Sequence, residues 1–141
     1  MTSLPFDQHR FLQAQEPVFS TVRSELQAGR KTTHWMWFIF PQLRALGRSG
    51  TARFYGLEDR AEAAAYAAHP VLGARLLECA ELVMHTPDRS AHQIFGSPDD
   101  LKLCSCMTLF EQAAPHPVFT GVLERFYGGE RDGLTLQLLS T

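Results

Sequence analysis

Residues 34–42 of this chain read HWMWFIFPQ, which places two tryptophans and two phenylalanines between a histidine and a glutamine. Burial of each large aromatic ring stabilises a fold by about 1.5–3 kcal/mol, so most of this run leaves water when the chain folds. The run either belongs to the hydrophobic core or lines a pocket that has polar groups at both ends. Core packing is the more frequent use of such side chains, and the pocket is the alternative.

The composition around this run is that of an ordinary globular protein. The 141 residues, 45% of them hydrophobic and 11% aromatic, suit one domain over residues 1–141 that buries about two-thirds of the surface of the unfolded chain. The 13 basic and 15 acidic residues give a net charge of -2, which favours neither a nucleic acid nor an anionic membrane as a partner.

Further observations concern the cellular compartment of the protein. The first residues, MTSLPFDQH, carry neither a basic start nor a long apolar region, so no secretory signal is predicted. The longest apolar run, residues 35–41, is far shorter than the ~20 residues of a transmembrane helix. We therefore expect a soluble, cytoplasmic protein. The three cysteines are an odd number and two of them are only two residues apart, so reduced thiols are expected.

Helix signals dominate the sequence on both sides of the aromatic run. Asp7 is predicted to cap a helix that ends at Gly29 and is kinked or split by Pro17. Residues 34–50 have no helical period and are predicted to be irregular, with a short extended or 3₁₀ piece at most. A functional loop is most naturally placed in such a segment.

Residues 59–141 contain several further helix starts. The tripeptide His-Pro-Val occurs at both 69–71 and 116–118, and both copies are predicted to begin a helix. The predicted helices are residues 60–68 behind an Asp59 cap, His69-Pro70 to about His85, one or two turns in residues 89–95, Ser97 as cap with Pro98 at the first position to about Ala113, a helix from His116-Pro117, and a last helix from Asp132. The pattern predicts an all-α fold, a compact array of about six helices with one irregular aromatic-rich loop.

Three motifs carry a resemblance to a known family. They are KTTHWMWFIFPQ at residues 31–42 followed by Tyr55, HPVLG at 69–73 and DLKLCSCMTLF at 100–110. In this order they resemble the bacterial and fungal family known as the domain of unknown function number eighteen-ten. The resemblance implies a small, mainly α-helical single domain and implies no established reaction, substrate or cofactor. Cys106 stands where the family pattern has serine, which argues against a required nucleophile or ligand at that position.

One group of polar residues is a candidate ligand site. Lys102, Ser105 and Thr108 are spaced three apart, so on a helix their amine and two hydroxyls form one polar stripe. Beside an aromatic floor, such donors suit a phosphorylated or nucleotide-like ligand, whose base stacks on the rings while its oxyanions are held by the donors. The candidate ligand-binding residues are Lys31, His34, Trp37, Gln42, Lys102, Ser105 and Thr108. The alternative is that both hydroxyls bond to carbonyls of their own helix and that Lys102 faces water.

Other chemistries are less well supported. None of the six histidines forms a zinc motif, and the spacing of Cys104 and Cys106 does not match a zinc clamp, so no metal site is predicted. A thiolate at either cysteine with His34 as its base is disfavoured, because both thiols are expected inside a helix near its apolar side. General acid–base chemistry by His34 with Asp100 or Asp132 stays open, and no catalytic residue is assigned.

Two classes of function follow from these patterns. In the first, the domain binds a phosphorylated small molecule between the aromatic loop and the helix that begins near Ser97, with or without catalysis. In the second, it is a non-enzymatic module that binds another protein or a copy of itself, which predicts an exposed apolar patch of several hundred Å². The first class is favoured, because a protein-binding helix does not need His, Lys, Gln, Ser and Thr around two indoles.

Overall fold

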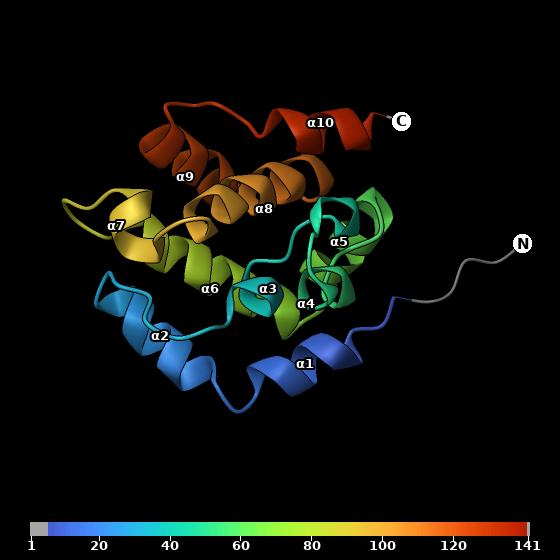
Figure 1. The fold of residues 1–141 in the computed structure, drawn as a ribbon, viewed down its shortest axis with the longest axis horizontal. Helices are drawn as coiled ribbons and strands as arrows, with labels where there is room; N and C mark the ends of the chain where they lie inside the picture. Colours follow the sequence, from blue (N-terminus) through green and yellow to red (C-terminus); the bar gives the residue numbers. More distant parts are fainter. Residues whose placement is uncertain (1–5, 141) are drawn as a thin grey trace, which may run out of the picture.

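The computed structural model describes residues 6–140, and the regular structure in this range is helical, without strands (Figure 1). The prediction of an all-α fold is therefore confirmed. The helices are α1 (His9–Gln15), α2 (Phe19–Gln27), α3 (Met36–Ile39), the 3₁₀-helix η1 (Arg44–Leu46), α4 (Gly50–Phe54), α5 (Arg60–Ala68), α6 (Leu72–Met84), α7 (Ala91–Phe95), α8 (Asp99–Ala113), α9 (Pro117–Tyr127) and α10 (Gly133–Leu139). The prediction about a secretory signal falls mostly on residues 1–5, outside the described residues.

The predicted number of about six helices is wrong, since residues 6–140 contain ten α-helices. Pro17 splits the first predicted helix into α1 and α2, as its missing N–H and fixed φ favour. The segment predicted to be irregular, residues 34–50, contains the four-residue helix α3 and the 3₁₀-helix η1, of which only a 3₁₀ piece was predicted. The five-residue helix α4 begins at the last residue of this segment. Helices this short span little more than one turn, so no 3.6-residue period identifies them.

An N-cap side chain accepts a backbone hydrogen bond at the start of five of the ten α-helices among residues 6–140. Asp59 accepts a hydrogen bond from the N–H of Glu62, and Asp132 accepts one from the N–H of Thr135, as predicted for both aspartates. The predicted Ser97 cap is wrong, because Pro98 is the residue before α8. Gln8 directly precedes α1, and the Asp7 side chain accepts a hydrogen bond from the N–H of His9, the first residue of that helix, at 3.1 Å.

The two His-Pro-Val tripeptides begin helices through their histidines. The Nδ1 atom of His69 accepts hydrogen bonds from the N–H groups of Val71 and Leu72, which lead into α6. In the same way, Nδ1 of His116 accepts from the N–H of Val118 in the first turn of α9. Imidazole thus takes the place of the usual Asp or Ser, because an unprotonated ring nitrogen satisfies N–H groups that no carbonyl reaches.

Replacing His116 with alanine is expected to lower the free energy of unfolding by about 1 kcal/mol, the usual cost of a lost N-cap. His116→Asn is expected to retain most of this stability, because its side-chain oxygen reaches the same N–H. The exposed His9 provides the control, and His9→Ala is expected to change stability by less than about 0.5 kcal/mol. Urea denaturation of the three variants measures the effect, and equal stability of His116→Ala and the wild type would contradict the cap.

The hydrophobic core is one continuous cluster that extends over α1 to α9. Figure 1 shows α6 and α8 through the middle of the molecule, with α1 and α2 on one side and α9 and α10 on the other. Residues 103 and 105–110 of α8 are buried almost all round, and its first turn is only partly covered. The fold therefore places the start of α8 at the surface, beside the aromatic run. None of the described helices is long and apolar enough to cross a membrane.

Candidate functional site

The aromatic run divides between core and surface. Trp35 is 1% exposed, and residues 36 and 38–40 are buried with it. Trp37 is half-buried and packs at the edge of the core cluster. The short helix α3 causes this division, because consecutive helical side chains point in directions about 100° apart. Most of the run is core, and Trp37 alone has the partial exposure that a ligand-stacking ring needs.

Glu25 organises the loop in front of this helix. Its buried carboxylate accepts hydrogen bonds from the N–H groups of Thr32 and Thr33, from the Thr33 hydroxyl at 2.6 Å and from the Trp35 indole at 3.0 Å. Burial raises the pKa of this carboxyl, but the four donors outweigh burial and lower the pKa to about 2. The carboxylate on α2 thereby fixes the path of the chain from Lys31 to Trp35.

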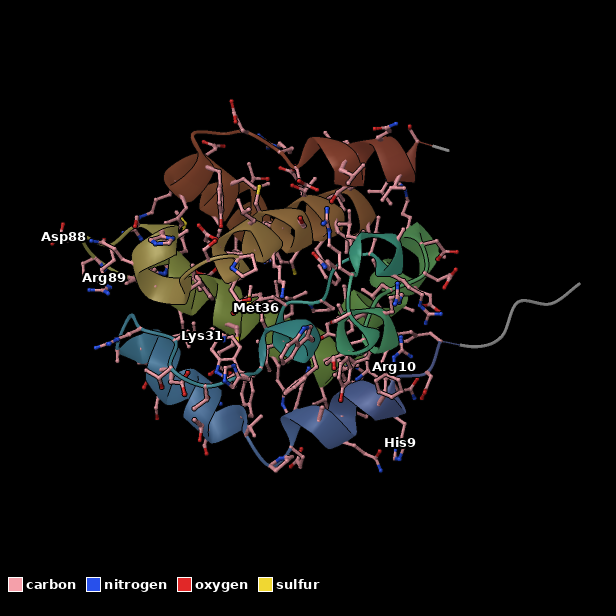
Figure 2. All side chains as sticks on the ribbon, in the orientation of Figure 1. His9, Arg10, Lys31, Met36, Asp88 and Arg89 are labelled. Carbon is pink, nitrogen blue, oxygen red and sulfur yellow. The ribbon has the colours of Figure 1, made fainter. Side chains whose placement is uncertain are left out.

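Lys31 and Lys102 meet at one carboxylate. The Nζ atom of Lys31 lies 3.0 Å from Oδ2 of Asp99, and the Nζ atom of Lys102 lies 3.5 Å from Oδ1 of the same residue. The Lys31 side chain is only 7% exposed, whereas that of Lys102 is 26% exposed. Figure 2 labels Lys31 in the loop that follows α2. The loop and the first turn of α8 are therefore joined by an ion triad of net charge +1.

Each lysine also lies on a tryptophan. Lys31 Nζ is 5.0 Å from the centre of the Trp35 ring, and Lys102 Nζ is 5.6 Å from that of Trp37, both within the range of cation–π attraction. The sequence contains only these two lysines and these two tryptophans. We call the group formed by Lys31, Trp35, Trp37, Asp99 and Lys102 the lysine–tryptophan site.

A small cavity of about 10 Å³ adjoins this site. This volume holds about one water molecule, so a nucleotide or a sugar cannot be enclosed there. The cavity is lined by Met36, Trp37, Phe40, Gln42, Ala52, Tyr55 and Lys102. Gln42 thus lies beside Trp37 and Lys102, as the sequence predicted, and any larger ligand has to rest on the surface above them.

The remaining predicted site residues lie elsewhere or face other groups. Ser105 donates to the carbonyl of Leu101, and the fully buried Thr108 donates to the carbonyl of Cys104. Both hydroxyls therefore bond to their own helix, which is the alternative that the sequence left open. His34 is exposed in the loop that Glu25 holds.

The thiols are buried or half-buried, and the two carboxylates considered for catalysis with His34 each contact another group. Burial raises the pKa of Cys79 to about 12 and that of Cys104 to about 11, and burial also raises the pKa of Cys106. These thiols stay protonated and poorly nucleophilic at neutral pH. Asp100 lies 3.4 Å from Nδ1 of His92, and Asp132 caps α10, so each carboxylate already has a partner other than His34.

Sequence reasoning missed two residues of this region, Asp99 and Glu25. An acid in the first turn of a helix, such as Asp99, usually just favours the positive end of the helix dipole, so its residue type alone gives no signal of a site. Glu25 stands at a buried position of an amphipathic helix, where the spacing of its neighbours predicts an apolar side chain. That mismatch between residue type and position was the available signal for Glu25.

The fold and this site together describe a small all-helical protein with an ion triad held between two indoles. The model of the family "Protein of unknown function (DUF1810)" matches residues 5–139, and the chain belongs to this family. The chain is also similar to the conserved hypothetical protein Rv1873 from Mycobacterium tuberculosis. The two are 52% identical, and the match covers 98% of this chain and 99% of that one with a TM-score of 0.95. The curated proteins include no match to this chain.

Proposed function

We propose that this domain binds a small phosphorylated metabolite, such as a sugar phosphate or a nucleotide, at the lysine–tryptophan site. The proposal is carried by the meeting of both lysines of the chain at Asp99, with the ammonium group of each lysine over one of the two tryptophans. The other eleven of the 13 basic residues are arginines. An ammonium group is a compact point charge that binds phosphate without the planar geometry of a guanidinium.

The exposure of the site determines how the ligand would lie. Lys31 is almost fully covered, so its ammonium group helps to hold the site together through Asp99. Lys102 is the more exposed of the two and is the direct contact for a phosphate oxygen. The exposed part of the Trp37 ring then supports the body of the ligand, as aromatic rings do for sugars and bases. Gln42, beside both, adds an amide that donates and accepts hydrogen bonds.

A protein-binding module is the alternative, and the surface favours it less. Such a module needs a contiguous apolar patch of several hundred Å². The large hydrophobic side chains exposed among residues 6–140 belong to α4, the residue before α6, α8 and α10 rather than to one helix face. They are Phe54, Val71, Leu101, Leu134 and Leu136.

A thermal-shift titration with inorganic phosphate, glucose 6-phosphate and AMP tests the proposal. A bound ligand at ~100 times its dissociation constant stabilises the folded state by about 2.7 kcal/mol. Lys102→Met keeps the aliphatic stem on Trp37 and removes the charge, so affinity is expected to fall at least about tenfold. The melting temperature without ligand is expected to change little, because the ion pair of Lys102 with Asp99 is long, at 3.5 Å, and partly exposed, and surface ion pairs contribute about 0–1 kcal/mol.

Two further variants sharpen the test. Asp99→Asn raises the charge of the site from +1 to +2 and keeps an acceptor for Lys31, so phosphate affinity is expected to rise about threefold or more. Arg23, which pairs with Glu78 on the outer face of α2 and α6, provides the control, and Arg23→Met is expected to bind like the wild type. Unchanged affinity in Lys102→Met, or no shift with any phosphate compound, would refute the proposal.

A further inference from the structure

A second candidate site lies in a groove between the N-terminal part of the chain, α4 and α5. The groove is open to solvent and has a volume of about 1040 Å³. The groove is distinct from the lysine–tryptophan site. Helix α4 lies between the groove and the small cavity beside that site, since Ala52 lines the cavity, while Arg53 and Phe54 line the groove. Figure 2 shows Arg10 on the side of α1 that faces this region, with His9 on the opposite side.

Arg10 is buried in the wall of this groove with one edge of its guanidinium poorly satisfied. Its side chain is only 9% exposed. The Nη1 atom donates to the carbonyl of Asp7 at 2.7 Å, whereas the contact of Nη2 with the carbonyl of Gly56 is long, at 3.4 Å. The buried Nε atom has no hydrogen-bond partner among the described residues. Such an orphaned donor costs about 1–3 kcal/mol and points to a group other than the described residues.

The geometry of that edge specifies the missing group. The Nε and Nη2 atoms of arginine form a planar fork that matches the two oxygens of a carboxylate. The fork is held in place because the guanidinium carbon lies 4.6 Å from the centre of the Phe11 ring and 5.8 Å from that of Phe6. Because Nε is buried, a carboxylate reaches it only after the side chains that cover it move aside.

The other charges around the groove limit the charge of the ligand. Three arginines and four acidic residues give the lining a formal charge of −1, which disfavours a dianion such as a phosphate monoester. The three arginines are Arg10, Arg44 and Arg53, and the four acids are Asp7, Glu58, Asp59 and Glu62. Arg44 already pairs with Glu58 at 3.3 Å, and Asp59 caps α5. The guanidinium of Arg53 makes no ion pair or hydrogen bond with residues 6–140, so it is available to a ligand.

The apolar part of the lining indicates the body of the ligand. Phe54, 57% exposed, is an exposed aromatic side chain next to the available Arg53, and Phe6, Ala61 and Ala65 also line the groove. An aromatic or aliphatic group placed on these side chains removes apolar surface from water on both partners. We propose that the groove binds a monocarboxylate with an aromatic or aliphatic body, its carboxylate on the Nε–Nη2 edge of Arg10 and its apolar part on Phe54.

NMR titration of the arginine Nε–H signals with three matched probes tests the inference. Phenylacetate is expected to shift the Arg10 signal and to bind at least about tenfold more tightly than phenylacetamide, which lacks the charge. Phenyl phosphate, a dianion near neutral pH, is expected to bind more weakly than phenylacetate. Equal binding of phenylacetamide, tighter binding of phenyl phosphate, or shifts confined to other arginines would each overturn the proposal.

Variants distinguish the planar fork of the Arg10 guanidinium from its positive charge as the cause of binding. Arg10→Lys retains the positive charge and loses the fork, and it is expected to weaken phenylacetate binding at least about tenfold. Arg53→Gln is expected to weaken phenylacetate binding less than Arg10→Lys does, and Arg23→Gln is expected to leave it unchanged. Unchanged affinity in a folded Arg10→Lys protein would overturn the proposal, and if this variant does not fold, the comparison of the three probes on the wild type decides. Lys102→Met is expected to bind phenylacetate normally, which keeps this result independent of the phosphate proposal.

Discussion

Replacing Trp35 with alanine is expected to lower the free energy of unfolding by about 3–5 kcal/mol, the range for a fully buried large aromatic side chain. Trp35 is 1% exposed, its ring packs near those of Phe40 and Phe95, and its indole N–H donates to Glu25 at 3.0 Å. Truncation leaves a cavity in the core and removes one of the four donors that satisfy a buried carboxylate. Since a domain of this size has about 5–15 kcal/mol of total stability, a large fraction of the free energy of unfolding is expected to be lost.

Urea denaturation of Trp35→Ala and Trp37→Ala side by side measures this effect. The half-buried Trp37 ring is expected to cost only about 1–2 kcal/mol, because part of its surface is already in water. Trp35→Phe is an intermediate case that keeps an aromatic ring and loses the hydrogen bond to Glu25. Equal losses in the two alanine variants would contradict the division of the aromatic run between core and surface.

Glu25→Gln is expected to cost about 3 kcal/mol at neutral pH, the free energy that corresponds to the lowered pKa of this carboxyl. Burial raises the pKa, but hydrogen bonds from Thr33, Thr32 and Trp35 lower it from 4.5 to about 2. A neutral amide accepts from these donors more weakly, and its own N–H₂ group faces donors instead of acceptors. The loop that carries Lys31 is expected to loosen as a result.

The same carboxyl makes stability depend on pH in a defined direction. Because the folded-state pKa of Glu25 is lower than its unfolded value of 4.5, its contribution is fully present above pH 4.5 and is lost as the pH falls toward 2. The stability difference between the wild type and Glu25→Gln is therefore expected to be largest at neutral pH and to vanish near pH 2. Glu111, whose pKa is lowered by its hydrogen bond from Arg131, shifts both proteins alike and cancels in the difference. A difference that stays constant from pH 7 to pH 2.5 would show that the charge of Glu25 is not what stabilises the loop.

The helices that sequence reasoning located well are those with a chemical start signal and at least two turns. The helix predicted over residues 60–68 behind Asp59 agrees with α5, and the His-Pro-Val tripeptides begin α6 and α9. The missed helices, α3 and α4, have too few residues to show a period, and they form because neighbouring elements bury their side chains.

The residues of the candidate site were predicted only in part, because residue type and spacing are local properties of the sequence. Lys102 and Trp37 are conspicuous by residue type, and the structure places both around one small cavity with Gln42. The hydroxyls of Ser105 and Thr108 were grouped with Lys102 by spacing alone, but α8 is buried almost all round from residue 105 onward, so they bond to their own helix. Spacing on a helix indicates which residues share a face, and it does not indicate whether that face meets solvent or another helix.

The sequence by itself determined that this chain folds into helices, where most of them begin, and that its lysines and tryptophans are scarce enough to be informative. These properties are local, since caps, prolines and apolar periods act within a few residues. Only the tertiary structure decided that Asp99 joins the two lysines, that Glu25 holds the loop before Trp35, and that Arg10 has an unsatisfied edge beside a groove. Each of these arrangements joins residues that lie apart in the sequence. The packing of the core determines which of them lie next to one another.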